Sequence, residues 1–93
     1  MNAWIESLPA DKVAAWISTN GDNACAVHMT EDPHFALWLH YLDRACRRRV
    51  LMSYRDLEDW DYWAAYDGGM SPVEACVDML DANGYSDAYE EAL

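Results

Sequence analysis

The stretch TEDPHFALWLHYLDRACRRRV, residues 30–50, decides the fold because it predicts the longest helix of the chain. Thr30-Glu31-Asp32-Pro33 has the residue types that begin a helix. The apolar residues that follow recur at the intervals of one helix face: Phe35, Leu39, Leu42, Cys46 and Val50, with Trp38 and Ala45 beside them. The opposite face carries His40, Asp43, Arg44 and Arg47. We therefore expect a helix to about residue 50 whose apolar stripe is covered by the other segments.

Two helical segments are expected before this helix. Ser7-Leu8-Pro9-Ala10-Asp11 predicts a helix start capped by Ser7, and Asn20-Gly21 predicts its left-handed end. The apolar stripe of that helix would be Val13, Trp16 and Ile17, and a short turn would pack on the same core through Trp4, Ile5 and Leu8. Residues 22–31 fit either a strand-like run or a short helix. A lone strand would have no partner, so we favour a helical turn or an extended loop.

The C-terminal part predicts further short helices. Ser53 is a candidate cap, followed either by a short turn and a new helix at Trp60 or by one helix through Asp67 that Gly68-Gly69 ends. Ser71-Pro72-Val73-Glu74 has the pattern of a capping box, and Asn83-Gly84 ends the helix that follows. The stripe of that helix would be Val73, Cys76, Val77 and Leu80, and Ser86 is a candidate cap for a last turn over 87–93. The prediction is an all-α fold, a small irregular bundle of four to five helices in one domain, 1–93.

The composition is that of a chain that folds alone and stays in the cytoplasm. Hydrophobic residues make up 53% of the chain, with five Trp and six Tyr. No apolar run approaches the roughly 18–20 residues of a membrane span, and the first residues do not resemble a secretory signal. The three cysteines, Cys25, Cys46 and Cys76, are an odd number, which favours reduced thiols and a cytoplasmic location, in the host cytoplasm if a phage encodes the chain.

Charge divides the chain into two unlike halves. The net charge is −11, yet residues 1–55 hold six acids and six bases, whereas residues 56–93 hold eleven acids and no Lys or Arg. This excludes direct binding of nucleic acid by the second half and favours a basic protein surface as its partner. The cluster Arg44, Arg47, Arg48, Arg49 and Arg55 fits either a phosphate-binding patch or internal pairing with the acidic half. We favour the internal pairing.

The sequence contains no strong motif for metal binding, catalysis or phosphate binding. Cys25 and His28 have a Cys-x-x-His spacing, but the second ligand pair of a structural zinc site is missing, so no metal is expected. No Gly-x-Ser-x-Gly is present, and no Lys-Ser/Thr follows Gly68-Gly69 as in a phosphate loop. The carboxylates are expected on solvated helix faces, where their pKa values stay ordinary. We therefore expect neither an enzyme nor a cofactor.

The most unusual segment is Trp60-Asp61-Tyr62-Trp63-Ala64-Ala65-Tyr66, in which Trp60 and Trp63 fit one helix face and Tyr62 and Tyr66 another. Since one face cannot bury both pairs, some of these rings should be exposed among acids. On the next helix, acids recur opposite the apolar stripe. The predicted partner-binding residues are Asp59, Asp61, Tyr62, Tyr66, Asp67, Glu74, Asp78 and Asp81. Acids four residues apart on one helix are ~6 Å apart, so imitation of DNA would need several helices to converge.

Residues 59–75, DWDYWAAYDGGMSPVEA, resemble a segment of short proteins of phages and plasmids, in which an aromatic and acidic helix runs into a Gly-x-Ser-Pro-x-Glu-Ala turn. The size, the acidity, the Trp content and the single Lys also look like those of small phage-encoded inhibitors of host defence, the anti-CRISPR and anti-restriction proteins. The resemblance implies a non-enzymatic protein that blocks a large basic target, sometimes as a DNA mimic. It carries over no site residue, because those inhibitors share no common motif.

Two functional hypotheses follow. The first is an inhibitor or adaptor, monomeric or a small homo-oligomer, whose acidic half binds a basic surface of a nucleic-acid-binding defence complex. The second is a small structural or assembly protein that self-associates through exposed aromatic side chains, with its acidity serving solubility. Electrostatic binding would weaken steeply as salt rises, whereas aromatic self-association would hardly change.

Overall fold

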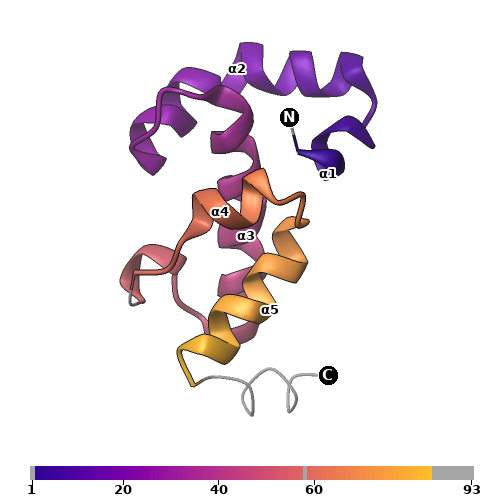
Figure 1. The fold of residues 1–93 in the computed structure, drawn as a ribbon. Helices are drawn as coiled ribbons and strands as arrows, with labels where there is room; N and C mark the ends of the chain where they lie inside the picture. Colours follow the sequence, from indigo (N-terminus) through magenta and orange to yellow (C-terminus); the bar gives the residue numbers. More distant parts are fainter. Residues whose placement is uncertain (1, 58, 85–93) are drawn as a thin grey trace.

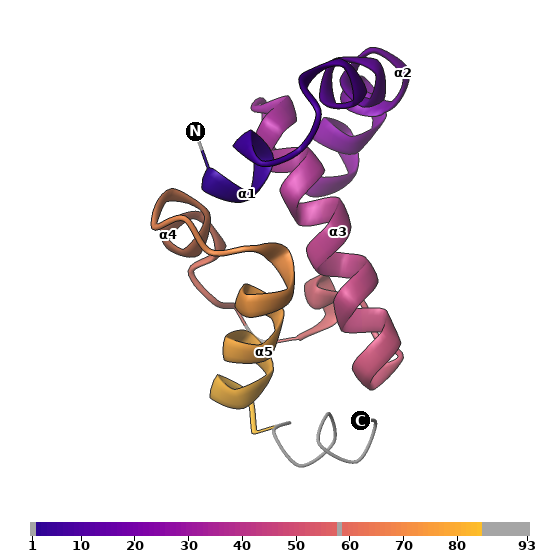
Figure 2. The ribbon, with the colours of Figure 1, turned by 90° about the vertical axis from the view of Figure 1, so that its right-hand side faces the viewer.

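The computed structural model describes residues 2–57 and 59–84, and it shows an all-α fold, as predicted (Figure 1). The helices are α1 (Ala3–Glu6), α2 (Ala10–His28), α3 (Pro33–Val50), α4 (Tyr62–Asp67) and α5 (Pro72–Ala82), with a 3-10 turn η1 (Tyr54–Asp56). Within the described residues no strand is formed, and no helix is long and apolar enough to cross a bilayer. Helix α2 crosses α3 near the beginning of α3, and α5 packs along α3 (Figures 1 and 2).

Helix α3 forms the centre of the core. Asp32 caps it, accepting hydrogen bonds from the backbone N–H groups of His34 at 2.9 Å and Phe35 at 3.3 Å. The predicted stripe is buried except at its two ends, Phe35 and Val50, which are partly buried. Trp38, Leu42 and Cys46 are fully inaccessible to solvent, and Ala36 and Leu37 are buried as well. The buried band is wider than one stripe because α2 and α5 both pack against α3. At 18 residues α3 is one residue shorter than α2, so it is not the longest helix.

Helix α2 corrects the prediction that Asn20-Gly21 ends a helix. The helix continues through residues 22–28 and ends at Met29, which takes the left-handed conformation at φ 56°. Gly21 is buried, and a Cβ built on it would lie 3.2 Å from Cγ2 of Ile17 and 3.8 Å from Cβ of Pro33. The glycine therefore permits close approach to the start of α3 and does not terminate the helix.

The entry into α2 also differs from the prediction. Pro9, without a side-chain cap, precedes the first residue of α2, whereas Ser7 ends α1 and its hydroxyl donates to the Trp4 carbonyl at 2.6 Å. The predicted turn around Trp4 and Ile5 is confirmed as α1, with Ile5 buried. Ser7 therefore ends α1 and does not cap α2, which begins three residues later.

Asn2 forms an N-terminal clasp, which we define as its bonds to α1, Tyr66 and Met70. Its Oδ1 accepts from the N–H groups of Trp4 at 2.8 Å and Ile5 at 3.4 Å, which caps α1. Its Nδ2 donates to the carbonyls of Tyr66 at 2.8 Å and Met70 at 2.9 Å. The Met70 carbonyl also accepts from the indole N–H of Trp38 at 2.9 Å. One buried side chain thus ties α1 to the connection between α4 and α5.

The C-terminal elements settle the alternatives left open by the sequence. Ser53 caps η1, and a separate helix, α4, begins after Asp61, so the single helix through Asp67 is wrong. Gly68 ends α4, and the capping box of α5 is present, with Ser71 and Glu74 exchanging hydrogen bonds at 3.1 and 3.2 Å. Asn83 ends α5, as predicted. The predicted turn over 87–93 lies outside the described residues.

The buried face of α5 is rotated from the predicted stripe. Its buried residues are Pro72, Ala75, Cys76, Met79 and Leu80. Val73 is 50% exposed and Val77 is half-buried. Both sets have helical spacing and share Cys76 and Leu80; the observed face buries Met79 and Ala75 in place of Val73 and Val77.

Candidate partner-binding surface

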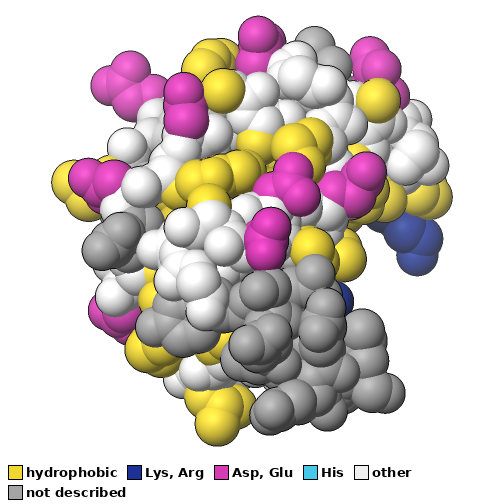
Figure 3. All heavy atoms as spheres, turned by 60° about the horizontal axis from the view of Figure 1, so that its bottom comes forward, with side chains coloured by type: hydrophobic (Ala, Val, Ile, Leu, Met, Phe, Trp, Pro, Cys, Tyr) yellow, Lys and Arg dark blue, Asp and Glu magenta, His cyan; other side chains and the backbone are white. Residues whose placement is uncertain are grey.

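The acidic surface is the set of carboxylates that the structure describes between residues 56 and 84. All of them are exposed, and the same span contains no Lys or Arg: Asp56, Asp59, Asp61, Asp67, Glu74, Asp78 and Asp81. Among the described residues, none lies within ion-pair distance of a base. Figure 3 shows one face of the molecule, where carboxylates are spread among hydrophobic and polar side chains and Lys or Arg lie only toward one edge. The surface is negative but the charges are not contiguous on that face.

Two of the predicted partner-binding acids have structural roles. Asp61 caps α4, since its Oδ1 accepts from the Ala64 N–H at 3.0 Å. Glu74 closes the capping box, and hydrogen bonds from the Ser71 backbone and hydroxyl lower the pKa of its carboxyl. Replacing either residue would therefore change a helix cap as well as a charge. Asp59, Asp67, Asp78 and Asp81 are exposed and accept no hydrogen bond from another described side chain or helix start.

Of the predicted contact residues Tyr62 and Tyr66, Tyr66 belongs to the core and Tyr62 is partly buried against it. Tyr66 is 5% exposed, and its ring lies 5.0 Å from that of Phe35 and 5.7 Å from that of Trp38. Tyr62 is half-buried, and burial raises the pKa of its phenol. The exposed ring on α4 is that of Trp63, at 51%. Tyr66 is buried because α3 presents Phe35 and Trp38 to it.

The arginine cluster does not pair with the acidic surface in the part of the chain that the structure describes. Arg47 pairs with Asp43, one turn earlier in α3, at 2.8 Å. Asp43 also accepts from Ser53 Oγ at 2.5 Å. Burial opposes its ionisation, but the hydrogen bonds from Ser53 and Arg47 outweigh burial and lower the pKa of Asp43. Arg55 donates to the Val27 carbonyl at 3.2 Å, and Arg44 lies over the ring of Tyr41 at 5.5 Å.

The residues considered for metal binding are engaged otherwise. His28 Nδ1 lies 2.6 Å from the hydroxyl of Tyr54, and Cys25 is half-buried. Cys46 and Cys76 are fully buried free thiols on facing helices, and a hydrogen bond with Cys76, together with burial, raises the pKa of Cys46. In residues 2–57 and 59–84, no three His, Cys, Asp or Glu side chains form a cluster that could hold a metal ion. The observed contacts give these residues packing roles.

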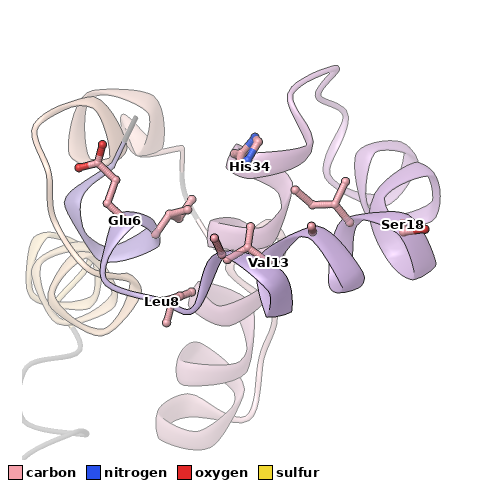
Figure 4. Close-up of a pocket in the computed structure, with 9 residues that line it drawn as sticks. Glu6, Leu8, Val13, Ser18 and His34 are labelled. Atoms are coloured by element: carbon pink, nitrogen blue, oxygen red, sulfur yellow. The ribbon is translucent and has the colours of Figure 1, made fainter.

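An apolar groove, which the sequence did not reveal, runs between α1 and α2 (Figure 4). Its volume is about 590 Å³, and aliphatic side chains line most of it, among them Ile5, Leu8, Val13 and Ile17. Glu6 and His34 lie on its two sides. Groove residues come from two helices and the start of a third, so helical periodicity within one segment could not have shown it.

A second hollow is lined mainly by aromatic rings and lies between the start of α3, η1 and α4. Its volume is about 320 Å³, and Trp60 and Trp63 contribute to its wall. Asp61 is its acidic side chain. The aromatic segment was visible in the sequence, but its combination with Phe35 and Tyr54 depends on the packing of α4 against α3 and η1.

Comparison of the chain with known protein families, curated proteins and solved structures finds no match. The function is therefore inferred from the chemistry of these surfaces.

Proposed function

We propose that the protein is a non-enzymatic binding protein that inhibits a partner by covering its basic surface with the acidic surface of η1, α4 and α5. The observation that supports this is the uniformly negative charge of residues 56–84: every carboxylate that the structure describes there is exposed, and the same residues include no Lys or Arg. Like charges gathered in this way create a field that accelerates encounter with an oppositely charged surface. A negative field also keeps nucleic acid away.

The partner class proposed is a nucleic-acid-binding complex of a defence system, in keeping with the resemblance to anti-CRISPR and anti-restriction proteins. Such complexes hold nucleic acid in basic channels, which carboxylates can occupy in place of phosphates. Helices α4 and α5 are in contact, so their acids act on the same partner from two helices. Imitation of a phosphate backbone requires a charge density above that of a single helix, which the acids of the two helices would have to supply together.

The test compares two triple charge reversals that change the net charge equally. The first variant carries Asp67→Lys, Asp78→Lys and Asp81→Lys, all exposed positions of the acidic surface. The control carries Glu6→Lys, Asp11→Lys and Asp22→Lys, exposed positions of α1 and α2. Each variant is added to purified CRISPR effector and restriction complexes, and the association rate and the DNA occupancy of the complex are measured at several salt concentrations.

We expect the first triple variant to slow association about tenfold or more at low salt, with a smaller loss at high salt. The control should change the rate much less, because its charges lie on other helices. Equal losses in the two variants would show that only net charge matters. An unchanged rate in the first variant, with a partner that the parent binds, would refute the acidic surface as the binding site.

The alternative, an assembly protein that self-associates, is favoured by one specific observation. Trp63 exposes 51% of its surface on α4, and the large apolar side chains of Met29 and Leu51 expose 92% and 87%. Sedimentation of the parent and of Trp63→Gln over a range of concentrations tests it. Salt-independent association that Trp63→Gln abolishes would support the assembly protein, and a monomer at all concentrations would exclude it.

A further inference from the structure

The aromatic hollow between α3, η1 and α4 has the composition of a site for a cation. Five aromatic side chains and one carboxylate dominate its lining: Phe35, Tyr54, Trp60, Tyr62, Trp63 and Asp61. Among the lining residues Leu39 and Tyr54 are buried, at 3% and 7% exposure, and Trp63 is exposed, at 51%. The faces of aromatic rings carry partial negative charge, so a hollow built from them attracts cations without a full complement of acids.

The rings are held in a fixed arrangement by their mutual contacts. Tyr54 and Tyr62 meet edge to face with centroids 5.0 Å apart, and Trp60 meets Tyr62 at 5.3 Å. On the other side Phe35 and Trp63 meet at 5.0 Å, with their planes at 85°. Since these rings come from α3, η1 and the segment around α4, the hollow exists before any ligand arrives. A preformed site loses less conformational entropy on binding.

The charged groups around the hollow also favour a cation. Asp61 is the one acidic or basic side chain among its lining residues apart from His28. Its Oδ1 is fixed by the Ala64 N–H, and none of the described residues donates to Oδ2. Burial lowers the pKa of His28, so this ring is neutral near neutral pH and does not repel a cation. Arg55 lines the adjoining hollow of about 300 Å³ and is not among the lining residues of this one.

Tyr62 contributes its ring to the hollow and not its hydroxyl. Its hydroxyl is buried and has no hydrogen-bond partner among the described residues. Buried polar groups are nearly always hydrogen-bonded, because leaving one unpaired is unfavourable. The ring of Tyr62 lines the hollow, whereas its hydroxyl is inaccessible to solvent and does not contribute a polar group to the site.

We propose that this aromatic hollow binds the guanidinium group of an arginine side chain presented by a basic partner protein. The inference rests on the proposed function, and it names the chemical group that the acidic surface would receive. A guanidinium group is planar and weakly hydrated, stacks on aromatic rings and pairs with a carboxylate, whereas a lysine ammonium is strongly hydrated. Trp60 and Trp63 supply the ring faces, and Asp61 Oδ2 supplies the acceptor.

The experiment titrates the ¹⁵N-labelled full chain with N-acetyl-arginine-methylamide and follows the indole N–H signals. Trp60 and Trp63 should shift together and saturate, while the signals of Trp4 and Trp16, which do not line the hollow, should stay in place. The citrulline analogue has the same shape without the charge, and we expect it to bind about tenfold more weakly or worse. The lysine analogue should also bind more weakly, and tetramethylammonium tests whether any weakly hydrated cation suffices.

Matched variants separate charge from structure. Asp61→Asn keeps an oxygen that can cap α4 but removes the negative charge. It should lower the affinity for the arginine probe about tenfold. Asp67→Asn, at the end of α4 and not among the lining residues, should leave the affinity within about twofold, since salt screens a charge that does not meet the bound cation directly. Equal binding of the citrulline analogue, stronger binding of tetramethylammonium, or equal shifts of all the indole signals would overturn the inference.

The two proposals fail in different ways. If the arginine probe does not bind while reversal of Asp67, Asp78 and Asp81 still slows association with the partner, only the guanidinium site is wrong. If the probe binds at Trp60 and Trp63 and the triple reversal has no effect on any partner, the guanidinium site stands and the acidic surface is wrong.

Discussion

Asn2→Asp is a one-atom change that tests the N-terminal clasp. Asn2 is 2% exposed, and its amide donates to the carbonyls of Tyr66 and Met70. The substitution keeps the oxygen that caps α1 but removes both donors. It also places a negative charge opposite two carbonyl oxygens in a buried position. The change therefore separates the capping of α1 from its attachment to the α4–α5 connection.

The magnitude follows from the bonds that are lost. Each net hydrogen bond contributes about 1 kcal/mol, so the two donations account for about 2 kcal/mol. Neither carbonyl is left unpaired, because Met70 O also accepts from Trp38 and Tyr66 O from Gly69. The unpaired carboxylate adds about 1–3 kcal/mol, which makes the expected loss about 3–5 kcal/mol. The total free energy of unfolding of a domain of this size is roughly 5–14 kcal/mol, so the variant should be only marginally folded.

The assays are urea unfolding, which gives the free energy of unfolding, and thermal unfolding, which gives the melting temperature, both followed by circular dichroism at neutral pH. The melting temperature should fall by roughly 12 °C or more, since each kcal/mol shifts it by about 4–8 °C in a domain of this size. Lowering the pH toward about 4 should narrow the difference from the parent, because a protonated carboxyl regains one donor. Asn20→Asp, at an exposed position of α2, is the matched control and should change stability by less than about 0.5 kcal/mol.

An unfolding free energy of Asn2→Asp within about 0.5 kcal/mol of the parent would show that the clasp does not form. A large loss with the same pH dependence as the parent would show that the introduced charge is not buried. The first result would refute the attachment of α1 to Tyr66 and Met70, and the second would refute the burial of the introduced carboxylate.

Three further predictions concern Leu51, the three cysteines and His28. Leu51 ends α3 at φ 60° and is 87% exposed, so Leu51→Gly should raise the unfolding free energy by about 1 kcal/mol in urea; a decrease would contradict the left-handed end. A thiol reagent should modify Cys25 in the native protein but Cys46 and Cys76 only on unfolding, and three equal rates would contradict the packing of α3 against α5. Burial lowers the pKa of His28, so stability should fall as the pH drops below about 6.5, where the unfolded chain takes up the proton first. His28→Gln should flatten that part of the curve of melting temperature against pH, and an unchanged slope would exclude His28 as a cause.

Local signals in the sequence determined most helix boundaries. Asp32-Pro33, Ser53, Ser71 with Glu74, and Asn83 all act where they were predicted to act. Capping hydrogen bonds join residues no more than about four positions apart, so the residues that specify them are adjacent in the sequence. The periodicity of residues 35–46 likewise predicted the central helix, because its apolar residues face one direction whatever packs against them. The absence of bases after Arg55 determined the sign of the C-terminal surface.

Tertiary structure alone decided which of several equivalent faces became buried. Helix α4 has only six residues, and its tyrosine and tryptophan faces are both apolar; contact with Phe35 and Trp38 of α3 buried Tyr66 and left Trp63 exposed. Gly21 has the local character of a helix end, yet α2 continues through it because the start of α3 packs against that position.

The clasp and the aromatic hollow are also products of tertiary structure. Asn2 bonds to residues 64 and 68 positions away, and the hollow joins Phe35 and Tyr54 to the segment around Trp63. Such contacts form only when the loss of chain entropy on bringing distant segments together is offset by burial of the whole core. No pattern within one segment of the sequence carries that information.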